Sequence, residues 1–74
     1  MSIFDIEMVP VSSSNLTAVG YDEQNNVLRI AFKSGDVYDY YDVPPDIFQN
    51  LMSAESLGSY HYYNIRMNFA YEKL

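Results

Sequence analysis

Residues 27–40 constrain the fold most, because they predict a β-hairpin whose register can be counted along the chain. Two runs rich in β-branched and aromatic residues, 27–33 and 37–40, flank a turn that ends in Gly35. A three-residue hairpin loop commonly ends in a glycine with positive φ. Counted outward from this turn, the predicted pairs are Ala31 with Val37, Ile30 with Tyr38, Arg29 with Asp39, and Leu28 with Tyr40.

This register separates apolar from charged side chains. It places one apolar group on a single side of the sheet, namely Val19, Tyr21, Leu28, Ile30, Tyr38 and Tyr40. Arg29 and Asp39 then form a cross-strand ion pair on the other side, which we expect to be exposed. A slip of one residue would set Asp39 against Ile30 and bury a carboxylate, so the unslipped register is favoured.

The segments before this hairpin extend the sheet. Residues 16–22 and 27–33 predict a second hairpin with the four-residue loop 23–26, which sets Val19 opposite Ile30 and Tyr21 opposite Leu28. Residues 3–12 contain Pro10, which cannot donate to a central ladder, so we expect residues 1–10 to form an irregular edge segment. Residues 12–15 are typical of a turn.

Two helices are predicted after the strands. Val43-Pro44-Pro45-Asp46 favours a helix start, and the helix should run to about Ala54. Its apolar stripe, which we expect to cover the face with Tyr38 and Tyr40, comprises Ile47, Phe48, Leu51 and Met52. Ser56 should cap a second helix from about Leu57 to Arg66, although Gly58 weakens that prediction. The last seven residues carry aromatic side chains that should pack back on the domain.

The predicted fold is therefore a single α+β domain over residues 1–74. It consists of an antiparallel meander of three to four strands, covered on one face by a helix, with a second short helix near the C-terminus. A chain of 74 residues has room for one core only, so a large internal cofactor cavity is not expected.

Composition excludes several classes of function. The chain has no cysteine, which excludes disulfides, a thiol nucleophile and cysteine-based zinc sites. Residues 1–7 carry acids where a secretory leader has Lys or Arg, and no apolar run has membrane-spanning length, so we expect a cytoplasmic protein without a membrane anchor.

The charge of −6 is unevenly distributed. Residues 1–28 contain four acids and no Lys or Arg, so we do not expect nucleic acid to bind there. Residues 55–74 are electrically neutral, with Arg66 and Lys73 against Glu55 and Glu72. Any nucleic-acid site should therefore be small and sensitive to salt.

Several motifs together resemble a known family. They are Ser13-Ser14-Asn15-Leu16, Val19-Gly20-Tyr21-Asp22, Phe32 with Gly35, Tyr38-Asp39-Tyr40, Val43-Pro44-Pro45, Ser56, Gly58, Tyr60, Asn64-Ile65-Arg66 and Tyr71. This pattern, over about residues 11–74, is similar to the KTSC domain. That family is named after the C-terminal extension of some lysyl-tRNA synthetases and also occurs as stand-alone bacterial and phage proteins. The resemblance implies a small binding domain for which RNA binding has been suggested.

Aromatic side chains near the C-terminus are the candidate binding residues. Tyrosine rings can stack on bases or pack against a protein partner, and Tyr62 and Tyr63 should project from the second helix. The candidate site comprises Tyr60, His61, Tyr62, Tyr63, Asn64 and Arg66. Two functions remain open: a non-catalytic module for RNA or an RNA-bound protein, and a protein-interaction accessory that associates with itself through these tyrosines or the edge near Pro10.

Catalytic and metal sites are not predicted. His61 is the single histidine, and no Ser, Cys or carboxylate stands at a spacing diagnostic of a general base. The acids at 36, 39, 42 and 46 fall on opposite faces of a strand or on the helix, so they indicate a solvated rim and not a metal site. We therefore expect no enzymatic activity, no metal and no small-molecule cofactor.

Overall fold

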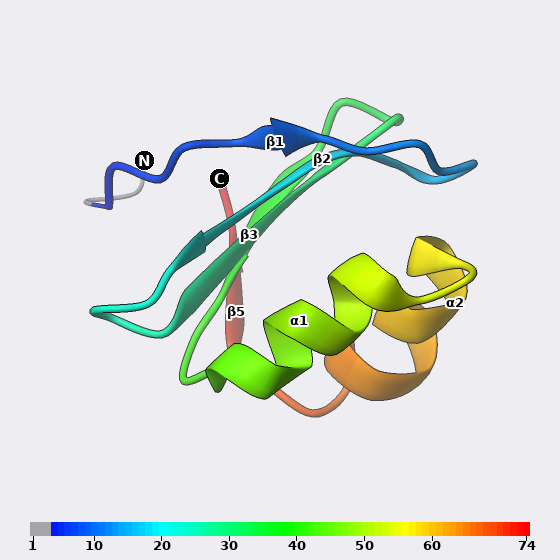
Figure 1. Cartoon of the computed structure of the whole chain (residues 1–74). Helices are drawn as coiled ribbons and strands as arrows, with labels where there is room; N and C mark the ends of the chain where they lie inside the picture. The colour runs from blue at the N-terminus through cyan, green and yellow to red at the C-terminus, as the bar shows by residue number, and fades with distance from the viewer. Residues whose placement is uncertain (1–3) are drawn as a thin grey trace.

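A computed structural model, which describes residues 4–74, shows five antiparallel strands in the order β1-β2-β3-β4-β5 with helices on one face (Figure 1). The elements are β1 (Val9–Pro10), β2 (Leu16–Asp22), β3 (Val27–Phe32), β4 (Val37–Tyr40), α1 (Pro45–Ser53), α2 (Leu57–Tyr60), the π-helix η1 (His61–Ile65) and β5 (Tyr71–Lys73). The α+β fold predicted from the sequence is confirmed. The sheet has one strand more than the three to four expected.

The predicted register of both hairpins is confirmed. In β3 and β4, Ile30 lies opposite Tyr38 and Arg29 lies opposite Asp39. Gly35 has a φ of 98°, and its N–H donates to the carbonyl of Phe32 at 2.9 Å, which closes the turn. The positive φ explains why glycine stands at this position.

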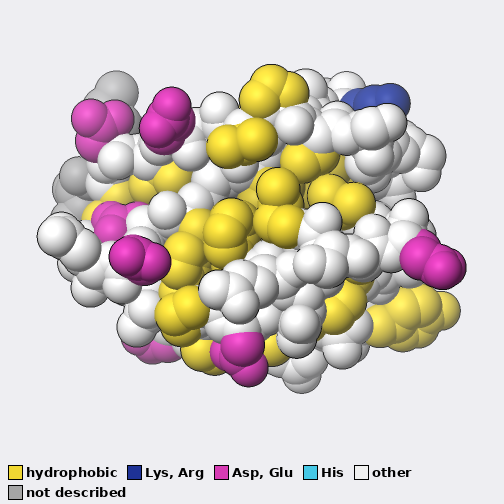
Figure 2. Space-filling model, viewed as in Figure 1, with side chains coloured by type: hydrophobic (Ala, Val, Ile, Leu, Met, Phe, Trp, Pro, Cys, Tyr) yellow, Lys and Arg dark blue, Asp and Glu magenta, His cyan; other side chains and the backbone are white. Residues whose placement is uncertain are grey.

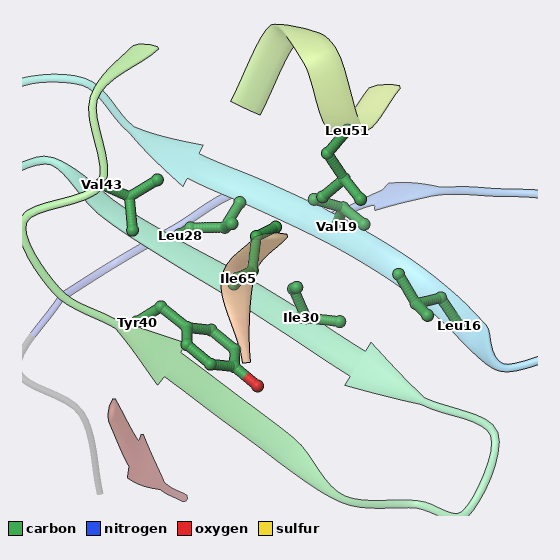
Figure 3. Packing of buried hydrophobic residues seen from close by; sticks show 8 residues of the cluster. All are labelled: Leu16, Val19, Leu28, Ile30, Tyr40, Val43, Leu51 and Ile65. Carbon is green, nitrogen blue, oxygen red and sulfur yellow. The ribbon is translucent and has the colours of Figure 1, made fainter. Parts of the chain in front are cut away.

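Helix α1 begins at the two prolines, as predicted, and covers one end of the sheet face. Leu51 is fully buried in the core, and the ring of Phe48 stacks on Tyr21 with centroids 4.9 Å apart. Figure 3 shows Leu51 from α1 pointing toward the sheet over Val19, and Ile65 from η1 pointing toward the sheet near the Tyr40 ring. The core cluster comprises Leu16, Val19, Leu28, Ile30, Tyr40, Val43, Leu51 and Ile65.

The cover over Tyr38 and Tyr40 differs from the prediction. Tyr40 is buried as expected, but both rings contact each other and Tyr71. Tyr38 also meets Phe32 edge-on, and Tyr40 also contacts His61. Helix α1 instead places Phe48 over Tyr21. The second helical segment and the C-terminal strand therefore complete the core at the β4 side.

The Arg29–Asp39 pair is not exposed, which corrects the sequence prediction. Asp39 is fully buried and the Arg29 side chain is 14% exposed, with Nε and Oδ1 2.7 Å apart. The second guanidinium nitrogen donates both to Asp39 Oδ2 and to the carbonyl of Phe4. The N-terminal segment therefore lies over this face of the sheet, which the sequence analysis had left open to water.

Gly20 allows the N-terminal segment to approach the sheet closely. A Cβ placed on Gly20 would lie 2.5 Å from the carbonyl oxygen of Glu7 and 2.7 Å from a methyl of Ile6. Backbone cannot yield at such distances without moving the segment. Gly20 is therefore required by the close approach of the backbone and not by a turn.

The two edges of the sheet are short strands. β1 pairs with β2 near Pro10, consistent with the predicted edge segment, whose residues 1–3 lie outside the described residues. The last seven residues pack back on the domain as predicted, but their strand β5 was not predicted: it pairs with β4 and sets Tyr71 opposite Tyr40. Within residues 4–74, the structure contains no helix with the length and apolar character needed to cross a bilayer.

Charged and apolar side chains are segregated on the face shown in Figure 2. Apolar side chains gather along the seam between the sheet and α1, and Asp and Glu side chains spread around its margin. Lys or Arg atoms appear only at one edge of this view, so this face offers little basic surface to a polyanion.

Candidate nucleic-acid interface

The second helical segment begins at the predicted cap and then widens into a π-helix. The Ser56 hydroxyl accepts a hydrogen bond from the Ser59 N–H at 3.2 Å, so the cap prediction is confirmed. The predicted continuous helix to Arg66 is α-helical only through Tyr60. From there the Arg66 N–H donates to the carbonyl of His61 at 2.9 Å, five residues back. π-helical turns are rare in proteins, and those that occur are often found at functional sites.

Two residues of η1 point inward and anchor the segment. Ile65 is fully buried in the core cluster, and His61 is only 9% exposed. The His61 Nε2 lies 2.7 Å from the Tyr40 hydroxyl oxygen, and its ring meets Phe32 edge-on at 5.0 Å. His61 therefore belongs to the packing beneath the site and does not lie on the exposed surface beside Tyr62 and Tyr63.

Burial sets the protonation of the His61–Tyr40 pair. Desolvation, assisted by the nearby positive charge of Arg66, lowers the pKa of His61 below its ordinary value. Desolvation likewise raises the pKa of Tyr40 to about 12. At neutral pH the Tyr40 hydroxyl therefore keeps its proton and is hydrogen-bonded to a neutral imidazole, whose tautomer sets which partner donates.

This pair makes stability depend on pH in a defined window. Because the folded pKa of His61 is lowered, the unfolded chain binds more protons once the pH falls below about 6.5, so stability should decrease from about pH 7 to pH 5. Urea midpoints measured across this range should fall for the wild type. His61→Gln keeps an acceptor for Tyr40 and should show a flatter profile; equal profiles for the two proteins would contradict the assignment.

Three residues of η1 point outward. Tyr62 is 53% exposed and Tyr63 is 76% exposed, and their rings meet edge-to-face with centroids 5.0 Å apart. Asn64 is also exposed, and its carbonyl accepts a hydrogen bond from the Asn68 side chain. We call Tyr62, Tyr63 and Arg66 the tyrosine patch, since the Arg66 guanidinium lies 5.1 Å from the Tyr62 ring centroid.

The predicted site residues are thus divided between two environments. Tyr60 is half-buried and packs against the core, and His61 is buried. Tyr62, Tyr63, Asn64 and Arg66 remain accessible. His61 and Ile65 are four positions apart and share one face of the helical segment, so they anchor it while the residues between them face water.

A hollow beside the tyrosine patch was missed by the sequence analysis. It has a volume of about 420 Å³ and lies between the β3–β4 turn, the 14–16 segment and the second helical segment. Its lining residues include Asn15, Lys33, Tyr62 and Arg66. No local pattern indicates this hollow, because its walls come from three parts of the sequence that fold together.

Metal binding is not supported by the described residues. Within residues 4–74, no group of three or more His, Asp or Glu side chains is placed to hold a metal ion. The single histidine is engaged with Tyr40.

Comparison with known proteins identifies the family. The family model for the KTSC domain matches residues 12–69. The chain belongs to the KTSC domain family. The crystal structure of a KTSC domain protein from Yersinia pestis superimposes with a TM-score of 0.91 at 37% identity, covering 95% of this chain and 99% of that one.

Curated relatives of this KTSC domain fall into two kinds. Proteins of Tsukamurella paurometabola and Stutzerimonas stutzeri are 45% and 42% identical over 53 residues, 72% of this chain, and the match covers 79% and 75% of their lengths. A lysine–tRNA ligase of Nostoc punctiforme is 33% identical over 99% of this chain, which corresponds to 14% of the ligase. The KTSC domain thus resembles both small proteins and a minor part of a much larger enzyme.

Proposed function

We propose that this KTSC domain is a non-catalytic module that binds single-stranded RNA, with bases stacking on the tyrosine patch. The observation that carries the proposal is the exposure of Tyr62 and Tyr63 on a π-helix whose inward residues are fixed in the core. A ring held on an anchored segment loses little conformational freedom when a base stacks on it. Base–aromatic stacking contributes about 1 to 3 kcal/mol per base and tolerates any sequence.

Arg66 adds a charge to this stacking surface. Its guanidinium already lies against the Tyr62 ring, so a phosphate that contacts Arg66 lies close to a ring on which a base can stack. The match to a lysine–tRNA ligase supports the choice of RNA, because a domain of the same family there forms part of an enzyme that, by its name, acts on tRNA. The charge of −6 argues for a short contact and not for a long electrostatic footprint.

Titration of a fluorescent single-stranded RNA tests this function. The wild type should bind at about 50 mM salt and more weakly at about 200 mM. Tyr62→Ala and Tyr63→Ala should each weaken binding by about 5- to 150-fold, the equivalent of losing one stacked base.

Two control variants make this test specific. Tyr62→Phe keeps the ring and should bind like the wild type, and Met67→Ala removes a neighbouring side chain that is highly exposed and apolar. Wild-type protein that binds no RNA at low salt would overturn the proposal. A molar mass by light scattering that falls on Tyr63→Ala would instead support self-association through the same rings.

A further inference from the structure

Among residues 4–74, the ion pairs leave two of the four basic side chains without a carboxylate. Arg29 is paired with Asp39, and Lys73 is paired with Asp36 at 3.4 Å. Within the described residues, Lys33 and Arg66 form no ion pair. Arg66 packs against the Tyr62 ring, so neither cation has its charge neutralised by a carboxylate and both are available to an anion from outside the chain.

Both of these cations line the same hollow. Lys33 lies in the β3–β4 turn and Arg66 lies at the end of η1, 33 positions apart in the sequence, yet both contribute to the wall of the 420 Å³ hollow described above. Every described residue that lines the hollow is uncharged or basic, and Asn15, Ser34 and Tyr62 are among them. None of them is an Asp or Glu, and several carry hydrogen-bond donors.

The walls of the hollow are fixed by backbone and packing contacts. The Lys33 N–H donates to the carbonyl of Asn15 at 2.8 Å, which joins the β3–β4 turn to the segment before β2. Helix α2 approaches Asn15 so closely that a Cβ on Gly58 would lie 2.8 Å from its Nδ2. The cations are therefore carried by a rigid frame, which reduces the entropy that a bound anion must overcome.

We propose that this hollow binds a phosphate group through Lys33 and Arg66. Lysine supplies a point charge and arginine a planar set of donors, the two side chains with which proteins hold phosphates. Tyr62 lines the same hollow, so the phosphate belongs to a nucleotide whose base can reach the tyrosine patch. This phosphate site rests on the proposed RNA-binding function, since the phosphate that it holds is that of the bound RNA.

Matched charge variants test the contribution of Lys33. Lys33→Gln and Lys73→Gln each change the net charge by the same amount, but Lys73 does not line the hollow. Affinity for single-stranded RNA, measured at several salt concentrations, should fall about two- to fivefold on Lys33→Gln, with the slope of log K against log salt reduced by about 0.7. Lys73→Gln should leave the slope unchanged. Equal effects of the two variants would overturn the phosphate site.

Pyrophosphate separates the failure of this site from the failure of RNA binding. In a ¹H–¹⁵N spectrum, pyrophosphate should shift the amide signals of Asn15, Lys33 and Arg66, and Lys33→Gln should reduce these shifts. Such shifts without RNA binding would keep the anion site and overturn the proposed function. RNA binding that depends on Tyr62, with no pyrophosphate shifts and no difference between the lysine variants, would keep the function and overturn the site.

Discussion

Replacing Asp39 by alanine should destabilise the protein by about 3 to 5 kcal/mol, since it leaves the guanidinium of Arg29 in a largely buried position without its carboxylate. A domain of 74 residues is expected to have a stability of roughly 4 to 11 kcal/mol, so this loss removes a large part of it. Urea unfolding followed by circular dichroism measures the effect directly.

The second ion pair of the protein provides the control. Asp36→Ala removes the same side chain from an exposed pair with Lys73, where both partners are about half accessible, and should cost no more than about 1 kcal/mol. A similar loss of stability in the two variants would show that the N-terminal segment does not bury Asp39. Replacing Arg29 and Asp39 together by apolar residues of similar size should recover much of the stability.

Replacing Leu51 by alanine should cost about 2 to 5 kcal/mol, because Leu51 is the α1 side chain that is fully buried in the core. The lost free energy combines the transfer of the removed methyl groups with the cavity left between α1 and β2. Denaturant midpoints with an unchanged m-value would assign the effect to native-state packing.

Asn50 is the matched position for this test. It precedes Leu51 on the same helix and is exposed, so Asn50→Ala should change stability by less than about 0.5 kcal/mol or increase it slightly through helix propensity. A cost for Leu51→Ala below about 1 kcal/mol would contradict the tight packing of α1 on the sheet.

The central part of the fold could be predicted from the sequence because its signals are local. Gly35 fixes the turn, and from that turn the alternation of apolar and charged residues determines the register of β3 and β4. The double proline at the start of α1 and the Ser56 cap are similarly local signals. Each depends on the backbone geometry of a few neighbouring residues.

Features that depend on contacts between distant segments were not predicted. β5 forms because Tyr71 can pair with Tyr40, and the Arg29–Asp39 pair is buried because the N-terminal segment crosses that face. A partial signal was present: an isolated glycine inside a strand, such as Gly20, is typical of a close approach by another backbone segment.

For the candidate site, the sequence predicted the positions of the exposed residues correctly but not those of the buried ones. The prediction that Tyr62 and Tyr63 would project from the second helical segment agrees with their exposure, whereas His61 was assigned to the surface and is buried. A buried tyrosine hydroxyl usually has a hydrogen-bond partner, and this requirement for Tyr40 could have indicated the single histidine. The π-helical turn has no comparable local signal in the sequence.

Mapping the RNA contact by ¹H–¹⁵N spectra tests the central claim most directly. That claim is that the outward residues of η1 bind RNA while its inward residues hold the segment in the core. With single-stranded RNA, the amide signals of residues 61–66 and of Lys33 should shift, and those of β1 and of the acidic loop 23–26 should stay in place. Shifts centred on β1 or on the 23–26 loop, with residues 61–66 unaffected, would contradict RNA recognition by the tyrosine patch.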